Sequence, residues 1–219
     1  MRNFQLFFKR LFDLVLSSLA LIILIPLFII IAILIKFTSE GPVFFLQERI
    51  GLKGKVFKII KFRTMVVNAE HIGDGIRVRT ENDSRITKVG RILRATSLDE
   101  LPQLINVITG SMSICGPRPP VTYVPYHGYD NYPDEMKRRF AMKPGITGLA
   151  QATVRNSATW DERIFIDIQY VNGFSLWLDI KVIVLTIKRV LKSESIYGTS
   201  IGVSDSEAEE TDELTTNIH

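Results

Sequence analysis

Two adjacent carboxylates, Asp99 and Glu100, lie in the stretch RATSLDELPQL, directly after a run of cations. The cations recur at every third position, at Arg85, Lys88, Arg91 and Arg94. An ionised Asp is a competent nucleophile toward phosphorus, and a neighbouring Glu can share a Mg²⁺ that also binds substrate phosphates. Nearby cations would neutralise charge on a diphosphate in the transition state. The stretch therefore fits phosphoryl-transfer chemistry.

The same acids also fit a plain helix start. Residues 98–110 carry apolar side chains at helical spacing, and Gly110 can end that helix. Pro102 restricts where the helix begins, because proline is tolerated only in the first turn. With Asp99 as the N-cap, Pro102 falls at the third helical position, and the helix dipole favours both acids.

A second candidate group is Arg118, which lies between Pro117 and Pro119 in the stretch GPRPP. The prolines fix the backbone, so the guanidinium is presented with little loss of entropy, and it suits bidentate contact with phosphate. A purely structural arginine in a loop is the alternative. The histidines have no partner at metal-ligand spacing, and the glycines match no phosphate-loop or dinucleotide pattern.

The remaining pattern predicts an α+β fold, mainly helical with one small β-hairpin. Residues 42–65 contain two β-rich runs around a turn with Gly51 and Gly54, which indicates a hairpin. Apolar spacing predicts further helices over residues 85–95, 132–142, 160–171 and 175–192. Glycine, proline and polar residues predict loops over residues 68–85, 115–120 and 143–151.

The N-terminal part contains 22 residues without charge, from Leu14 to Ile35, long enough to cross a bilayer as a straight helix. Two features favour a segment that dips in and returns. Pro26 lies near its middle, where proline kinks a helix, and cations flank both ends. A kinked spanning helix remains the alternative, because such helices are common.

Charge divides the chain unevenly. Residues 1–193 hold all 27 Lys and Arg residues and a net charge of +11, whereas residues 194–219 hold seven acids and no Lys or Arg. The basic body suits anionic lipids, phosphates or nucleic acid. The tail has too little apolar content to fold alone. The single cysteine excludes an internal disulfide and fits a reducing compartment.

We therefore expect a membrane-inserted hairpin over residues 1–36, a cytosolic catalytic domain over 37–195 and a disordered tail over 196–219. The last helix, residues 175–192, is amphipathic, with Trp177 and a cationic end, which is typical of a membrane interface. An ordinary packed C-terminal helix is the alternative for that segment.

Several motifs occur together and in order: KRLFDL, GPVFFLQERIG, FKIIKFRTM, DSRITKVGRILRATSLDELPQL, GPRP, KPGITGLAQ and WLDIK. Over about residues 9–193 the chain resembles the bacterial sugar transferases, the monotopic polyprenyl-phosphate phosphoglycosyl transferases of the small single-domain type. The serine that often precedes the membrane-break proline is replaced here by Ile25. The stretch QATVRNS also departs from the commoner QVNGRNS.

The resemblance implies transfer of a sugar 1-phosphate from a UDP-sugar to polyprenyl (undecaprenyl) phosphate, at the cytoplasmic face of the bacterial cell membrane. It implies that Asp99 is the nucleophile and that Glu100 helps bind Mg²⁺. It places Arg94 in the active site and Arg118 on phosphate. The expected phosphate-binding cations are Lys61, Arg63, Arg85, Lys88, Arg91 and Arg118. The expected partners are the two substrates and anionic lipids, without nucleic acid.

Two other classes fit the same residues. A membrane-anchored anion- or nucleic-acid-binding module would not need Asp99 and would show strong salt dependence. A Mg²⁺-dependent phosphohydrolase using the same carboxylates would release free sugar phosphate without a lipid acceptor.

Overall fold

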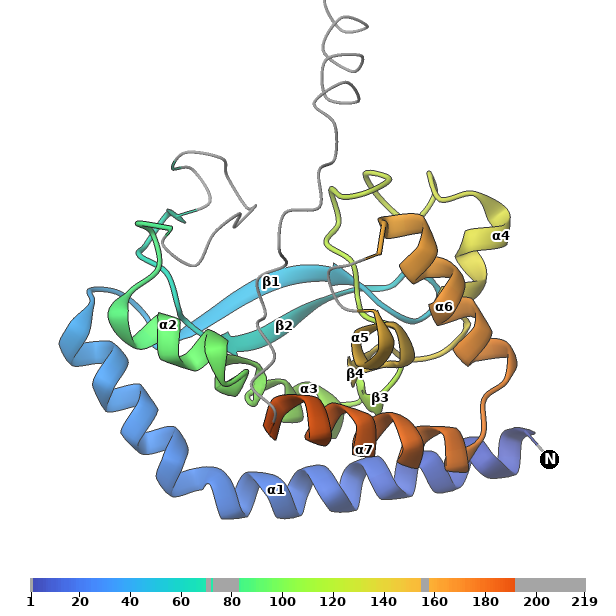
Figure 1. Cartoon of the computed structure of the whole chain (residues 1–219), viewed down its shortest axis with the longest axis horizontal. Coiled ribbons are helices and arrows are strands. Elements are labelled where there is room, and N and C mark those ends of the chain that lie inside the picture. The colour runs from blue at the N-terminus through green and yellow to red at the C-terminus, as the bar shows by residue number, and fades with distance from the viewer. Residues whose placement is uncertain (1, 70–71, 73–82, 155–157, 192–219) are drawn as a thin grey trace, which may run out of the picture.

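The computed structural model describes residues 2–69, 72, 83–154 and 158–191, so the predicted tail lies outside the described residues. The helices are α1 (Arg2–Thr38), α2 (Lys88–Ala95), α3 (Gln103–Ile108), α4 (Asp134–Lys137), α5 (Leu149–Thr153), α6 (Trp160–Asn172) and α7 (Leu176–Leu191). The strands are β1 (Phe44–Ile50), β2 (Val56–Phe62), β3 (Ser113–Cys115) and β4 (Gly145–Thr147). The fold is α+β and mainly helical, as predicted (Figure 1).

The predicted hairpin is confirmed. Strands β1 and β2 pair antiparallel from Phe44 with Phe62 to Ile50 with Val56, and a 3-10 turn, η1 (Leu52–Gly54), joins them. Gly54 has a φ of 80°, a left-handed conformation that glycine adopts without a Cβ penalty. The predicted helices over residues 160–171 and 175–192 are α6 and α7, and the one over 85–95 begins later, at Lys88.

The prediction that residues 143–151 form only a loop is wrong. Strand β4 lies in that stretch and pairs parallel with β3, Ser113 with Gly145 and Cys115 with Thr147. Three residues are too few to show the alternating pattern that marks a strand. The backbones approach so closely that a Cβ on Gly145 would collide with Gly116, which explains a glycine at this position.

The predicted apolar segment lies within α1, a single helix of 37 residues with Pro26 inside it. Figure 1 shows α1 as two arms that meet at a bend. Pro26 is the residue within the helix that has no N–H for the helical ladder. Among the described residues, α1 is the one helix long and apolar enough to cross a membrane, judged by length and composition. Its Ile22 and Ile23 side chains are 66% exposed.

The first arm of α1 is attached to the rest of the chain through a buried lysine. The Lys9 Nζ donates to Asp179 Oδ2 at 2.5 Å and to the Cys115 carbonyl at 2.8 Å. The Tyr170 hydroxyl donates to the other oxygen of Asp179 at 2.6 Å. Lys9 and Asp179 are 6% and 8% exposed, so this ion pair lies away from solvent between α1 and α7.

The other end of α1 is attached to the same body. The Arg63 guanidinium donates to the carbonyls of Ser39 and Glu40 and to the Ser39 hydroxyl, directly after the helix. The second arm packs its side chains into an apolar cluster with β2 and α2. The buried members of that cluster are Ile31, Ile35, Phe62 and Leu93. Both ends of α1 are therefore held by the same body.

The Lys9 attachment gives the first prediction. The substitution Lys9→Met keeps the apolar stem and removes the charge, which leaves Asp179 buried and unpaired. Breaking a buried pair in this way costs about 3–5 kcal/mol. We expect a clearly lower midpoint of thermal unfolding in lipid nanodiscs. The control, Lys36→Met, removes an exposed lysine of the same helix and should change the midpoint little. Equal midpoints for the two variants would show that the pair contributes nothing to stability.

Candidate active site

The two predicted acids lie on a 3-10 turn, η3 (Leu98–Glu100), which precedes α3. The expectation that Asp99 caps a helix over residues 98–110 is wrong, because α3 begins only at Gln103. Pro102 has no N–H to donate to the carbonyls of Leu98 or Asp99, so the helical ladder cannot run through it. The chain instead turns sharply before the acids, where Ser97 adopts a left-handed φ of 57°.

The acid turn is held against the hairpin by Asn106, a residue that sequence reasoning missed. The Asn106 side chain accepts from the Ile60 N–H at 2.9 Å and donates to the Lys58 carbonyl at 2.8 Å. It therefore pairs with the free edge of β2 as a neighbouring strand would. The available signal was a polar residue inside the apolar helix that follows the acids. Asn106 itself is 5% exposed.

This docking brings Glu100 together with two of the predicted cations. The Lys61 Nζ lies 2.6 Å from Glu100 Oε1, and Nη2 of Arg118 lies 3.4 Å from the same oxygen. Burial alone would raise the pKa of Glu100, but the two cations outweigh it and hold that pKa at about 2. Glu100 is thus ionised at neutral pH, and one of its oxygens, Oε2, is not used in these contacts.

The neighbouring Asp99 behaves in the opposite way. Burial raises its pKa to about 6, and the charge of Glu100 adds to this effect, while Lys61 and Arg94 oppose it. Most Asp99 carboxyls are still ionised at pH 7. Arg94 is oriented by the Thr64 hydroxyl, to which its Nε donates at 2.9 Å. Arg94 therefore lies close enough to Asp99 to stabilise its ionised form.

The loop that carries Arg118 is fixed at every residue from 116 to 120. Each of the five residues has a backbone hydrogen bond to a different part of the fold. The partners, in order, are the Thr147 carbonyl, the Gly145 N–H, the Arg139 guanidinium, the Arg49 guanidinium and the Ile50 N–H. The rigidity that the prolines predicted is therefore reinforced by tertiary contacts.

A cavity of about 640 Å³ opens beside the acid turn. Ser97, Glu100 and Arg118 line one part of it, and α5, α6 and α7 supply other lining residues. Asp99 is half-buried, and in the sequence it lies between the lining residues Ser97 and Glu100. Five arginines line the cavity, namely Arg49, Arg118, Arg139, Arg163 and Arg189. Four of them were missed, because their elements meet only in the tertiary fold. The cavity suits a ligand with several negative charges.

Two other residues that were predicted to bind phosphate, Arg63 and Arg85, make contacts away from the two acids. Arg63 holds the turn after α1, as described above. Arg85 is buried and bonds the Asp83 carboxylate and the carbonyls of Ala69 and Ile72. Both therefore support the fold, and a direct role on phosphate stays a prediction.

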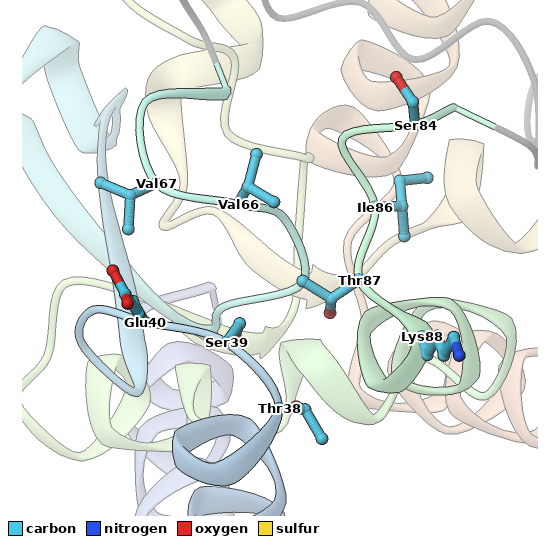
Figure 2. Close-up of a pocket in the computed structure, with 9 residues that line it drawn as sticks. All are labelled: Thr38, Ser39, Glu40, Val66, Val67, Ser84, Ile86, Thr87 and Lys88. Atoms are coloured by element: carbon cyan, nitrogen blue, oxygen red, sulfur yellow. The ribbon is translucent and has the colours of Figure 1, made fainter.

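Lys88 and Arg91 lie on α2, and both are exposed. Figure 2 shows Lys88 at a separate cavity of about 730 Å³, whose other walls include the segment after α1 and Val66 and Val67. The structure thus gathers Lys61, Arg94 and Arg118 around the acids, whereas Lys88 lines the separate cavity.

The acid turn can supply two carboxylates to a metal ion. In the part of the chain that the structure describes, no group of three or more His, Cys, Asp and Glu side chains could hold one. Mg²⁺ does not need such a group, because it is usually bound by one or two carboxylates together with substrate phosphates and water. Asp99 and the second oxygen of Glu100 fit that donor set.

Comparison with known proteins identifies close similarity over most of the chain. The bacterial sugar transferase family model matches residues 4–193. The chain is 43% identical to a UDP-glucose:undecaprenyl-phosphate glucose-1-phosphate transferase of Klebsiella pneumoniae, covering 90% of the chain and 43% of that protein. It is 40% identical to an undecaprenyl-phosphate galactose phosphotransferase of Salmonella typhimurium, covering 87% of the chain and 42% of that protein. The chain thus spans less than half the length of these relatives.

A relative of similar length also exists. The uncharacterized sugar transferase EpsL of Bacillus subtilis is 41% identical, and the match covers 88% of the chain and 91% of that protein. The matched part of the longer relatives therefore corresponds to nearly the whole of a shorter one.

The contacts of Glu100 give the second prediction. In Lys61→Met the nearest cation is lost while burial remains, so we expect the pKa of Glu100 to rise from about 2. Carbon-13 NMR of the labelled glutamate carboxyl, titrated in nanodiscs, measures this value. The matched control is Arg63→Met, two residues further along, whose guanidinium contacts Ser39 and Glu40 instead. A Glu100 pKa that moves equally in both variants would contradict the assignment of Lys61 as its partner.

Proposed function

Because the chain belongs to the bacterial sugar transferase family, we propose that it transfers a sugar 1-phosphate from a UDP-sugar to polyprenyl phosphate and releases UMP. The observation that carries this proposal is the pairing of Glu100 with Lys61 and Arg118, next to Asp99 and beside an arginine-lined cavity. The names of the relatives give the substrate class, and they include both glucose and galactose.

The proposed reaction has two displacements at one phosphorus atom. A carboxylate oxygen of Asp99 attacks the phosphorus that bears the sugar, and the bond from that phosphorus to the bridging oxygen breaks. UMP leaves with the electron pair, and the sugar phosphate remains on Asp99 as an acyl phosphate. An oxygen of the lipid phosphate then attacks the same phosphorus, and the Asp99 carboxylate leaves.

The residues around Asp99 have separate tasks in this scheme. A carboxylate with a pKa near 6 is ionised at pH 7 and is more basic than a free aspartate, which favours attack. Lys61 and Arg118 carry the positive charge that a diphosphate needs when charge shifts to the leaving UMP. Arg94 balances the charge of Asp99 before attack.

A magnesium ion belongs to the same proposal. Asp99 and Glu100 would hold a Mg²⁺ together with substrate oxygens, and the ion would supply positive charge beside the diphosphate. Glu100 is suited to this role because its low pKa keeps it ionised, and because Lys61 and Arg118 fix its orientation.

The covalent step gives the third prediction. Full-length enzyme in nanodiscs, incubated with UDP-glucose or UDP-galactose and Mg²⁺ but no lipid acceptor, should gain the mass of a hexose phosphate on Asp99. Asp99→Asn should abolish the adduct and lower UMP release by roughly 10³-fold or more, because an amide is a far weaker nucleophile. The control Asp134→Asn changes an exposed carboxylate and should leave both readouts intact.

Added undecaprenyl phosphate should discharge the adduct and form the lipid-linked sugar. Near-normal turnover by Asp99→Asn would exclude the covalent mechanism. Release of free sugar phosphate at the same rate without lipid would instead indicate the phosphohydrolase.

We further propose that α1 enters the membrane from the cytoplasmic side and returns to it. Support comes from the attachment of both its ends to one body, through Lys9 at one end and Arg63 at the other. A helix that spans the bilayer would carry Lys9 away from Asp179. Cations at both ends also favour the cytoplasm, and the exposed Trp177 of α7 suits contact with an anionic membrane interface.

This topology gives the fourth prediction. A cysteine in place of Asn3, near the start of α1, should stay unlabelled by an impermeant maleimide in intact spheroplasts and become labelled after permeabilisation. The native Cys115 gives no background, because it is fully buried. Pro26→Ala restores one backbone donor and should allow some labelling, because a straight helix favours spanning. Strong labelling of the parent in intact spheroplasts would mean that α1 spans the membrane.

A further inference from the structure

Arg118 is exposed and contacts Glu100 only at 3.4 Å, so its side chain alone does not fix its own position. Its backbone carbonyl, by contrast, accepts a hydrogen bond of 2.8 Å from Nη2 of Arg139. Arg139 belongs to a 3-10 turn, η4 (Arg138–Ala141), that lies outside the acid turn and the loop. An arginine that sequence reasoning did not single out therefore holds the loop at the residue that meets the acid.

The same nitrogen of Arg139 also binds Asp167 of α6. Nη2 lies 2.6 Å from Asp167 Oδ2, and the two side chains are 3% and 1% exposed. Burying two charges costs desolvation free energy that their attraction repays only in part, so a buried pair is weak evidence for stability. Burial accordingly raises the pKa of Asp167 to about 6, although Arg139 opposes the rise. What such a pair supplies is a fixed geometry.

We propose that Arg139 and Asp167 form a positioning pair that holds Arg118 where it neutralises the diphosphate. This inference rests on the proposed transferase function. Asp167 orients Nη2 of Arg139, Arg139 binds the carbonyl of Arg118, and Arg118 presents its guanidinium beside Glu100. The pair thus links α6 to the loop that carries Arg118, through the carbonyl of Arg118.

A competing interpretation is direct contact with substrate, because Arg139 and Asp167 also line the cavity. The two roles differ in their dependence on Arg118. A positioning pair loses its effect once the Arg118 side chain is gone, whereas a pair that touches substrate, or one that only supports folding, keeps its effect. Coupling between the sites therefore separates the roles.

The experiment is a double-mutant cycle in full-length enzyme, with UMP release from a saturating UDP-sugar as the readout. Asp167→Asn keeps the shape of the side chain and removes its charge. We expect it to lower kcat by roughly 10- to 100-fold in the parent, the size of effect that follows from a misplaced group. In the Arg118→Ala background it should lower kcat no more than about twofold, as expected for coupled residues.

The control cycle uses Ile164→Val, a fully buried position one turn earlier on α6 that tests loss of packing alone. Its effect should be the same with and without Arg118. If Asp167→Asn does not fold, Arg139→Lys replaces it in the cycle, because it keeps the charge on a shorter side chain with different geometry. An equal fold-change in both Arg118 backgrounds, or no change in the parent, would overturn the inference. Failure of the parent to release UMP would instead overturn the proposed function.

Discussion

The amide of Asn106 fixes the distance between the acid turn and the hairpin, and the arrangement of the site depends on that distance. Its two hydrogen bonds join α3 to the edge of β2 at Ile60 and Lys58, next to the residue that pairs with Glu100. An apolar residue at this position would leave the Ile60 N–H and the Lys58 carbonyl without this partner, which costs free energy. The acids and Lys61 thus meet because a helix completes the hydrogen bonding of a strand.

Once the acid turn is docked, burial and neighbouring charges shift the pKa values of the two carboxylates in opposite directions. Glu100 lies between Lys61 and Arg118, and its pKa is held at about 2. For Asp99 the nearby cations only partly offset the effect of burial, so its pKa rises to about 6. Neighbouring residues with such different environments suit different tasks, one as a permanent anion and one as a more basic carboxylate. The 3-10 turn allows both, since no regular helix forces the side chains apart.

The sequence predicts well what depends on local pattern and poorly what depends on distant contacts. The hairpin and the last two helices follow from alternation, glycine turns and helical spacing, and all were confirmed. The acids could be singled out from the sequence because adjacent carboxylates near cations carry a chemical meaning of their own. The cations were harder, because Arg63 and Lys61 are two residues apart and yet one supports a turn while the other meets Glu100.

The missed residues share a physical cause. Arg49 and Arg139 reach the site through backbone carbonyls of the loop that carries Arg118, and no local pattern marks an arginine that binds a carbonyl far along the chain. The start of α3 was misplaced because the missing N–H of Pro102 interrupts the ladder. Tertiary contacts thus determine the roles of the two arginines, whereas a local feature, the missing N–H of Pro102, determines where α3 begins.

The contacts of α1 connect the apolar helix to the candidate active site. The side chain of Asp13 accepts from the Ile114 N–H at 3.1 Å, and Lys9 donates to the Cys115 carbonyl, so the first arm of α1 holds β3 at two successive residues. Strand β3 leads directly into the loop that carries Arg118. A shift of this arm would therefore move the start of that loop, because the strand between them is only three residues long and is bonded on both sides. The position of the apolar helix and the position of Arg118 are thus linked by a short path of hydrogen bonds.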